Sequence, residues 1–257
     1  MSKNIRTNLS VSQNFLTSRK TIDRLLRIAN LTNTDNVLEI GAGKGHITKA
    51  LIKKCNFVTA VELDKTLYQK LSVSLAGERN IKLINNDFLK IKLPQNEYKV
   101  FANIPFSITT DIIKKLTQSE NPPVEAWLVM EKGASKRFSG KPDENLHSLL
   151  LKPFYDIEIK YYFSKDDFHP SPSVDTVLFH ISKKALPDIE FSNRIYYYDF
   201  INRAYKFGVN TLMTKRQISK ALRNASLPQS GETLYIQWLC LFRCYLYLNY
   251  NYKYEGK

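Results

Sequence analysis

Residues 98–103 (YKVFAN) form an apolar, strand-like run that ends in Asn103-Ile104-Pro105-Phe106. The exocyclic nitrogen of a nucleobase is a poor nucleophile because its lone pair is conjugated into the ring. The Asn103 side-chain oxygen and the Ile104 carbonyl, held by the rigid ring of Pro105, can accept both amino hydrogens and free that lone pair. Phe106 offers a flat face to a base that has left its stack. These residues predict N-methylation catalysed by positioning, without an obligatory general base; an ordinary Asn-x-Pro turn is the alternative.

Three glycines follow another strand-like run, in residues 39–46 (EIGAGKGH). Gly41, Gly43 and Gly45 predict a turn without side chains between a strand and a helix, where a ligand can approach backbone N–H groups. Their G-x-G-x-G spacing differs from the dinucleotide fingerprint G-x-G-x-x-G, which disfavours pyrophosphate binding and a nicotinamide oxidoreductase. A purely structural turn is the alternative for such a cluster taken by itself.

Two acids end the next two strand-like runs: Glu62 in VELD and Asp87 in NNDF. A carboxylate at the first strand tip can accept hydrogen bonds from ribose hydroxyls, and one at the neighbouring tip suits the amino group of adenine. Either acid alone would be an ordinary solvated residue. Two such carboxylates beside the same glycine turn predict an adenosine pocket. Because the sequence has no phosphate-binding motif, the ligand that fits best is S-adenosylmethionine.

Residues 12–16 (SQNFL) precede the first amphipathic pattern. One interpretation is an N-cap region in which Thr17 or Ser18 caps the helix. The other is a strap whose backbone at Asn14 and Leu16 closes over the cofactor.

The charge balance favours a polyanionic partner. The 257 residues include 38 Lys and Arg against 24 Asp and Glu, a formal net charge of +14. Each phosphate that such a protein neutralises releases counterions and adds affinity; a generically basic composition is the alternative. Residues 1–30 are basic, and no apolar stretch of signal-peptide or transmembrane length follows them. We therefore expect a cytoplasmic protein without a membrane partner.

The cysteines do not predict a disulfide framework or a metal site. Cys55, Cys240 and Cys244 form no CxxC motif. Cys240 and Cys244 have the i, i+4 spacing of a helix, where small core residues are a better interpretation than a pair of metal ligands.

The candidate site residues lie at the ends of short apolar runs, which are typical of the strands of a β-sheet. Short apolar runs predict strands at 36–41, 56–63, 80–85, 98–103, 124–131, 156–163 and 175–182. Helical patterns separate the early runs, which is typical of a doubly wound, mostly parallel α/β sheet of seven strands, with the last two runs as an antiparallel hairpin at one end. After Pro187 three helical patterns, 193–207, 214–225 and 233–250, predict a small C-terminal helical domain. We expect an S-adenosylmethionine-binding catalytic domain at 1–183 and a helical RNA-binding or support domain at 184–257.

Six motifs, in order, resemble the ribosomal RNA adenine N6-dimethyltransferases: QNFL, EIGAGKG, VELD, NND, NIPF and FHPSPSVD (168–175). The similarity spans essentially the whole chain. Within this group the chain resembles the erythromycin-resistance (Erm) branch. The resemblance lies in the NIP motif, where the housekeeping enzymes usually have NLP, and in residues 201–222 and 237–249. In two places the chain departs from that branch: Phe106 stands where most Erm proteins carry tyrosine, and residues 204–217 (AYKFGVNTLMTKRQ) diverge from the usual pattern.

The resemblance implies the S-adenosylmethionine-dependent methyltransferase fold. It also implies methylation of one adenine N6 in 23S rRNA, which blocks macrolide, lincosamide and streptogramin B binding. The residues that it places against S-adenosylmethionine are Asn14, Leu16, Gly41, Glu62, Asp87 and Asn103, and the glycine turn adds Gly43. Phe168 would sandwich the base opposite Phe106; packing as a loop anchor on Pro170 and Pro172 is the alternative. A small-subunit (16S) rRNA dimethyltransferase and a non-catalytic nucleic-acid-binding factor stay open as other functions.

RNA contacts are expected close to the QNFL strap. Arg6, Arg19 and Lys20 are the basic residues that we expect to bind the RNA, and to contribute more than Lys215, Arg216 and Lys220. We expect a monomer that meets 23S rRNA before ribosome assembly is complete.

Overall fold

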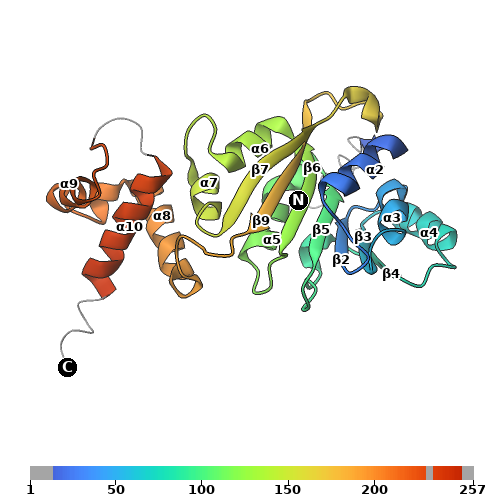
Figure 1. The fold of residues 1–257 in the computed structure, drawn as a ribbon, viewed down its shortest axis with the longest axis horizontal. Helices are drawn as coiled ribbons and strands as arrows, with labels where there is room; N and C mark the ends of the chain where they lie inside the picture. The colour runs from blue at the N-terminus through green and yellow to red at the C-terminus, as the bar shows by residue number, and fades with distance from the viewer. Residues whose placement is uncertain (1–13, 230–233, 251–257) are drawn as a thin grey trace, which may run out of the picture. The chain divides into compact units, whose positions relative to one another are not determined.

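The apolar runs of the sequence form one seven-stranded sheet in the computed structural model, which describes residues 14–229 and 234–250. Its strands are β2 (Asn36–Ile40), β3 (Phe57–Glu62), β4 (Ile81–Asn85), β5 (Lys99–Asn103), β6 (Glu125–Glu131), β7 (Tyr155–Tyr162) and β9 (Thr176–Lys183). Their order across the sheet is β4-β3-β2-β5-β6-β9-β7 (Figure 1). The predicted fold class is confirmed, and the last two strands lie side by side at one end of the sheet.

The sheet is mostly parallel. β2 pairs in parallel with both β3 and β5, β4 pairs in parallel with β3, and β6 does so with β5, whereas β9 runs antiparallel to β6. The strand order reverses between β2 and β5, and ligands of doubly wound sheets bind beyond the carboxyl ends of the strands at such a point. Asn103 ends β5 there, and the glycine turn follows β2.

One helix precedes the first strand of the sheet and the others lie between its strands. In chain order they are α2 (Arg19–Ile28), α3 (His46–Ile52), α4 (Lys65–Ser74), α5 (Thr109–Gln118) and α6 (Lys132–Ser139). α2 begins where Ser18 accepts a hydrogen bond from the Thr21 N–H at 3.3 Å, which confirms the predicted cap. Leu25 and Leu26 of this helix are buried with Val58 of β3 in the core.

The four helices α7 (Leu146–Leu151), α8 (Arg194–Phe207), α9 (Lys215–Asn224) and α10 (Tyr235–Tyr250) belong to a second unit. The last three correspond to the helical patterns predicted after Pro187. Aromatic side chains form the core between α8 and α10: Tyr197, Phe200 and Phe242 are fully buried, and the Tyr197 and Phe242 rings meet edge to face with centroids 5.0 Å apart.

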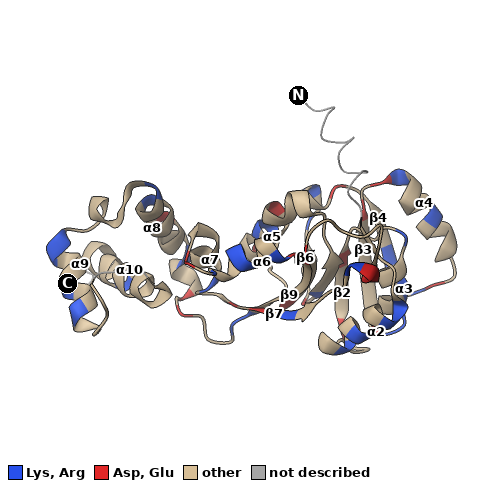
Figure 2. Ribbon diagram, turned by 90° about the horizontal axis from the view of Figure 1, so that it is seen from above, with Lys and Arg blue, Asp and Glu red and all other residues tan. Residues whose placement is uncertain are grey.

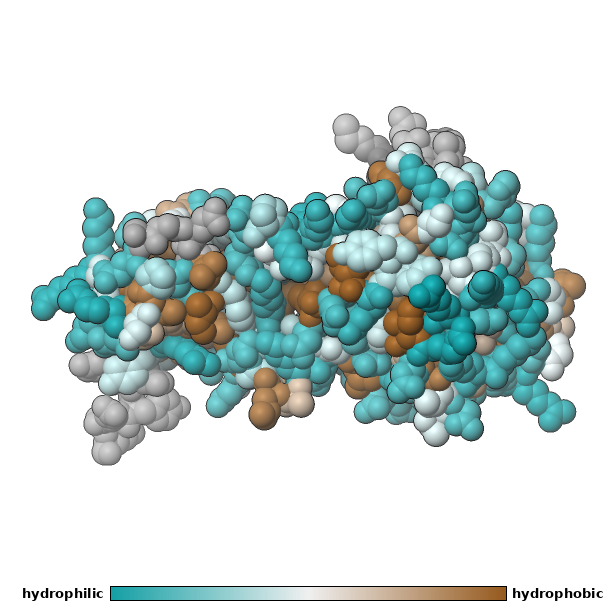
Figure 3. Space-filling model, turned by 45° about the horizontal axis from the view of Figure 1, so that its top comes forward, coloured by the Kyte–Doolittle hydropathy of each residue, from teal (hydrophilic) through white to brown (hydrophobic). Residues whose placement is uncertain are grey.

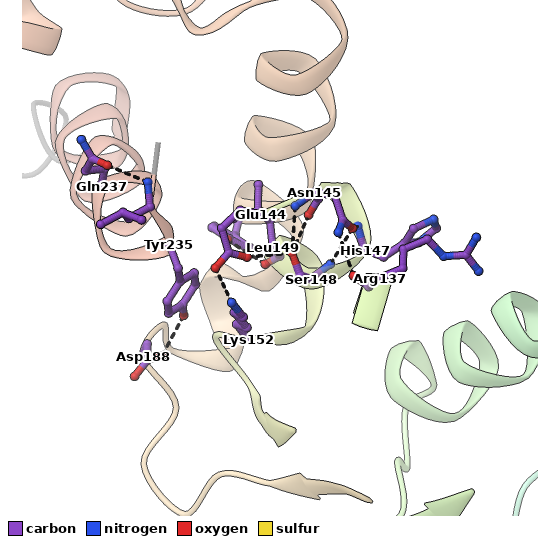
Figure 4. Close-up of polar contacts among 12 residues, drawn as sticks. Arg137, Glu144, Asn145, His147, Ser148, Leu149, Lys152, Asp188, Tyr235 and Gln237 are labelled. Atoms are coloured by element: carbon purple, nitrogen blue, oxygen red, sulfur yellow. Dashed lines mark hydrogen bonds and ion pairs between the residues drawn. The ribbon is translucent and has the colours of Figure 1, made fainter. Parts of the chain in front are cut away.

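Polar contacts stabilise α7, and Figure 4 shows those around Glu144, Asn145 and Ser148. The Glu144 carboxylate accepts the Ser148 hydroxyl at 2.7 Å and pairs with the Lys152 ammonium. The buried Tyr197 hydroxyl of α8 donates to the Leu149 carbonyl of α7 at 2.8 Å. A buried hydroxyl without such a partner is costly, so this bond helps to define the unit.

Within the described residues the chain accordingly divides into two compact units, one containing residues 14–135 and 156–183 and the other residues 136–155, 184–229 and 234–250. The predicted division at residue 183 therefore differs from the observed units in the segment 136–155, because α7 packs on α8. That each part acts as a separate domain, with the predicted roles, stays a prediction.

The described residues include no helix long and apolar enough to cross a membrane. The face drawn in Figure 3 is mainly hydrophilic, with separate apolar patches.

Cys240 and Cys244 are free and partly buried, and the Cys240 thiol contacts the Ala221 carbonyl at 3.4 Å. Within 14–229 and 234–250, no three His, Cys, Asp or Glu residues are grouped as metal ligands.

Candidate active site at the strand tips

The glycine turn adopts a backbone that side chains disfavour. Gly41, Gly43 and Gly45 have φ angles of 74°, 58° and 79°, in the left-handed region. The N–H groups of Gly41 and Ala42 donate to the Val61 carbonyl at 2.8 and 3.1 Å, so the end of β3 holds the turn in place. The turn thus exposes backbone rather than side chains at the tip of β2.

Two neighbours approach this turn closely. A Cβ atom on Gly41 would lie 3.8 Å from the backbone oxygen of Asn103, and one on Gly43 would lie 2.8 Å from Cε1 of Phe15. The second distance is shorter than real Cβ contacts, so glycine is required there for the Phe15 ring to pack on the turn. The Lys44 ammonium lies 4.7 Å from the centroid of the same ring.

Glu62 links the second strand tip to the turn. Its carboxylate is buried and accepts the Gly43 N–H and the Asp64 N–H, each at 2.7 Å. These two bonds use different carboxylate oxygens, and each oxygen keeps a second lone pair for a further donor. The geometry therefore provides a fixed acceptor at the predicted position.

Glu39, one residue before the end of β2, was not predicted as a site residue. It is 1% exposed, and its Oε2 has no hydrogen-bond partner in the part of the chain that the structure describes. Burial raises the pKa of Glu39 to about 8; Thr48 opposes this shift and the nearby Glu62 charge adds to it. The signal in the sequence is an acid inside an apolar strand, directly before the glycine turn.

Asn103 contacts the strap across the site. Its Nδ2 donates to the Asn14 backbone carbonyl at 2.7 Å. Because the NH₂ end of the amide makes this bond, the Oδ1 end is left as an acceptor. Ile104 follows in buried backbone, with its N–H donating to the Val129 carbonyl at 3.2 Å. Phe106 is half-buried at the start of a short 3-10 turn, Phe106–Ile108.

The strap is a short strand, β1 (Phe15–Leu16), which pairs antiparallel with β8 (Phe168–His169). The Thr17 N–H also donates to the Asp167 carbonyl at 3.1 Å. Residues from two motifs that are far apart in the sequence, 15–16 and 168–169, are therefore held against each other. Both interpretations of residues 12–18 are compatible, because Ser18 caps α2 while residues 15–16 form β1.

Phe168 and Leu16 point into the core. They are 4% and 2% exposed, and the Phe168 ring centroid lies 5.2 Å from that of Phe163. In this arrangement Phe168 acts as a loop anchor, although its neighbours in the core are Leu16 and Phe163. A stacking role for Phe168 stays a prediction that requires its ring to leave this packing.

Three further predicted residues are Asp87, Arg19 and Lys20. Asp87 is half-buried, and one of its oxygens accepts the Leu89 N–H at 2.9 Å. Arg19 and Lys20 are exposed in the first turn of α2, immediately after the strap, and Arg19 lies 4.0 Å from Asp23. Arg6 lies outside the described residues.

Comparison with known proteins points to one family. The profile of the family "Ribosomal RNA adenine dimethylase" matches residues 4–232. An rRNA adenine N-6-methyltransferase from Lysinibacillus sphaericus is 35% identical over 95% of this chain and 99% of its own length. One from Limosilactobacillus reuteri is 36% identical over 95% of this chain and 99% of its own. The crystal structure of the 23S rRNA methyltransferase ErmE superposes with a TM-score of 0.79 at 25% identity, covering 90% of this chain and 99% of that one.

Proposed function

This chain belongs to the ribosomal RNA adenine dimethylase family, and we propose that it methylates the N6 of one adenine in 23S rRNA with S-adenosylmethionine as methyl donor. The resulting modification would confer resistance to macrolides, lincosamides and streptogramin B. The hydrogen bond from Asn103 Nδ2 to the Asn14 carbonyl is the observation that carries the proposal, because it fixes the amide with its acceptor end available at the strand tips.

The strand tips suit S-adenosylmethionine. The backbone of the turn at Gly41 and Gly43 has left-handed φ angles and carries no side chains, so a ligand can approach it closely. Glu62 is held by two backbone N–H groups and keeps lone pairs for ribose hydroxyls. Asp87 at the next tip would accept the adenine amino group, and the strap at Asn14 and Leu16 would cover the cofactor.

S-adenosylmethionine supplies an electrophilic methyl group on a sulfonium. The protein positions the amine that attacks it: the Asn103 side-chain oxygen and the Ile104 carbonyl accept the two amino hydrogens of the target adenine. The nitrogen would then be pyramidal, with its lone pair free to take the methyl group as the carbon–sulfur bond breaks, and it would lose one proton to solvent. Pro105 fixes the backbone of these acceptors, and Phe106 supports the base by stacking. Rate enhancement arises from orientation and from preorganised acceptors.

The substrate also requires contacts away from the reacting base. RNA is recognised by its backbone, its shape and its unpaired bases. Arg19 and Lys20, which are exposed beside the strap, and Arg6 would bind phosphates of the flanking nucleotides. We further propose that the protein acts in the cytoplasm as a monomer, on 23S rRNA that is not yet fully assembled into the ribosome.

The test is transfer of labelled methyl groups to purified RNA. Protein-free 23S and 16S rRNA are incubated separately with the protein and labelled S-adenosylmethionine, and primer extension then locates the modified adenine. We expect label on 23S rRNA alone, with a stop at one adenine, and transfer by an Asn103→Ala variant that is slower by a factor of about 10²–10³. Label confined to 16S rRNA would instead establish the small-subunit activity, and a protein that binds RNA without transferring label would be a non-catalytic binding factor.

A further inference from the structure

Two carboxylates share one face of the sheet near the tips of β2 and β3. Glu39 pairs with Ala60 in the parallel register, and Glu62 is two residues further along β3. Because side chains two residues apart on a strand point to the same face, Glu39 and Glu62 lie on the same face of neighbouring strands. They are 1% and 4% exposed, and the glycine turn begins directly after β2, at Gly41. Acids are almost never buried to this extent unless they are paired.

The two carboxylates differ in their partners. Glu62 accepts the N–H groups of Gly43 and Asp64, each at 2.7 Å. The Glu39 Oε2 has no hydrogen-bond partner among the residues that the structure describes. An unpaired polar atom is costly in the interior of a protein, so its position directly before the glycine turn indicates a functional role.

This pair of acids keeps Glu39 protonated near neutral pH. Burial raises the pKa of Glu39 to about 8; Thr48 of α3 opposes this shift, and the charge of Glu62 adds to it. Figure 2 shows basic positions on α2 and α3, but Lys44 in the turn and Lys49 on α3 are exposed, and among the described residues Glu62 is the charged group that acts on Glu39. A cation placed beside the pair would reverse the balance, because an opposite charge at about 4–6 Å lowers the pKa of a carboxyl by about 1–3.

S-adenosylmethionine brings such a charge to the strand tips, whereas its product does not. Near neutral pH the methyl donor has a sulfonium, an ammonium and a carboxylate, so its net charge is positive. S-adenosylhomocysteine lacks the sulfonium charge and is neutral overall. We propose that Glu39 releases its proton to solvent when S-adenosylmethionine binds, and that the resulting carboxylate favours the methyl donor over S-adenosylhomocysteine. This inference rests on the proposed methyl transfer, because that reaction removes the charge.

The other acids of the site are not suited to this discrimination. Glu62 and Asp87 would contact the ribose and the adenine, which are identical in donor and product. A group that separates the two ligands has to respond to the charge on sulfur. Glu39 can respond because it is uncharged in the free protein and has an oxygen that no described residue occupies.

The test is calorimetric titration of the full-length protein, without RNA, in buffers of different ionisation enthalpy, which counts the protons released on binding. With S-adenosylmethionine at pH 7 we expect about 0.4–0.9 protons, and with S-adenosylhomocysteine fewer than about 0.2. Glu39→Gln keeps the shape of the side chain but has no proton to release, so its count should fall to the value seen with the product. The matched control is Glu125→Gln: Glu125 begins β6, at the other edge of the sheet, and pairs with Lys99 at 3.4 Å. This control should release as many protons as the wild type.

The affinity for S-adenosylmethionine should also depend on pH. Because the free protein has to lose the Glu39 proton on binding, the Kd should fall by about two- to twentyfold from pH 5.5 to pH 7. The amino group of the ligand stays protonated in this range, given a usual pKa of about 7.7–8.0. His46 is a further group to consider there, since burial and then Lys44 and Lys49 lower its pKa. The difference between wild type and Glu39→Gln removes its contribution, and for S-adenosylhomocysteine this difference should stay within about twofold.

Three results would overturn the proposal: no proton release by the wild type with S-adenosylmethionine, equal release with donor and product, or undiminished release by Glu39→Gln. If thermal unfolding shows that Glu39→Gln is not folded, infrared difference spectroscopy of the wild type decides instead. Binding of S-adenosylmethionine should then remove the carbonyl band of a protonated carboxyl, and a band that persists would contradict the proposal. None of these measurements uses RNA. Failure to methylate 23S rRNA would therefore count against the proposed function, while the proton count is scored separately.

Discussion

Asn103→Ala tests two roles of one side chain, a hydrogen bond that the structure shows and an acceptor role that we propose. The substitution removes the Nδ2 donor that contacts the Asn14 carbonyl at 2.7 Å. It also removes the Oδ1 acceptor that we propose for the target amine. Loss of the first contact should cost roughly 0.5–1.5 kcal/mol in holding the strap, as for a typical hydrogen bond. Loss of a preorganised acceptor in the transition state should cost roughly 2.7–4 kcal/mol, a fall of about 10²–10³ in kcat.

The measurement is a single-turnover rate with saturating S-adenosylmethionine and RNA, beside the cofactor Kd from calorimetry. We expect the rate to fall by the larger factor and the cofactor Kd to rise by about tenfold at most, since the strap loses only one hydrogen bond. Asn103→Asp is informative because it keeps an acceptor but places a carboxylate oxygen against the Asn14 carbonyl, so it should disturb the strap more than alanine does.

Asn121→Ala is the matched control. The Asn121 Nδ2 also donates to backbone carbonyls, those of Pro94 and Gln95 at 2.7 and 2.9 Å, but away from the strand tips. This variant should lose stability and keep its rate per folded molecule. If Asn103→Ala retains more than about a tenth of the wild-type rate, a barrier change under roughly 1.4 kcal/mol, the amide does not orient the amine.

Four further predictions concern the ring, the charges and the buried acid. Phe106→Tyr should stay active in the methyl-transfer assay and Phe106→Ala should lose most activity; equal rates in all three proteins would show that the base does not stack there. RNA affinity should fall by orders of magnitude between low and moderate salt, whereas a flat response in filter binding would make the +14 charge incidental. Arg19→Glu/Lys20→Glu should weaken binding of an rRNA hairpin at unchanged cofactor Kd, and unchanged hairpin binding would remove these residues from the interface. The pKa of Glu39 is about 8 in the folded protein, against an ordinary value of 4.5. Between these pH values the folded protein keeps the proton and the unfolded chain loses it, so the free energy of unfolding should fall as the pH rises. Glu39→Gln should reduce this fall in the free energy of unfolding by up to about 1.4 kcal/mol per pH unit, measured by thermal unfolding at pH 5 and pH 8. The same pH dependence in the wild type and the variant would contradict this prediction.

Features that depend on neighbouring residues could be predicted from the sequence. The apolar runs indicated the inner strands because burial on both faces of a parallel sheet requires continuous apolar residues. The edge strands β4 and β7 are less buried, and along β7 exposed residues alternate with more buried ones. The glycine turn was predictable because left-handed φ angles at Gly41, Gly43 and Gly45 favour glycine. The cap at Ser18 was one of two candidates, since Ser and Thr both serve at that position.

Features that depend on distant residues emerged only with the fold. Asn103 and Asn14 are 89 residues apart, and no local pattern indicates that the amide nitrogen of one contacts the carbonyl of the other. The pairing of β1 with β8 could not be predicted from the local sequence either, because each strand has only two residues, which are too few to show a period.

Burial likewise was decided by tertiary packing. Phe168 lies in a polar, proline-rich motif that gives no sign of a core position, yet its side chain is 4% exposed. Glu39 differs from Glu62 in its surroundings: Glu62 accepts two backbone N–H groups at the tip of β3, whereas Glu39 is enclosed and its Oε2 has no hydrogen-bond partner among the residues that the structure describes. Local propensity and periodicity depend on residues that are close in the sequence. The pKa of a carboxylate and the orientation of a side-chain amide depend on groups that only the folded chain brings within a few ångströms.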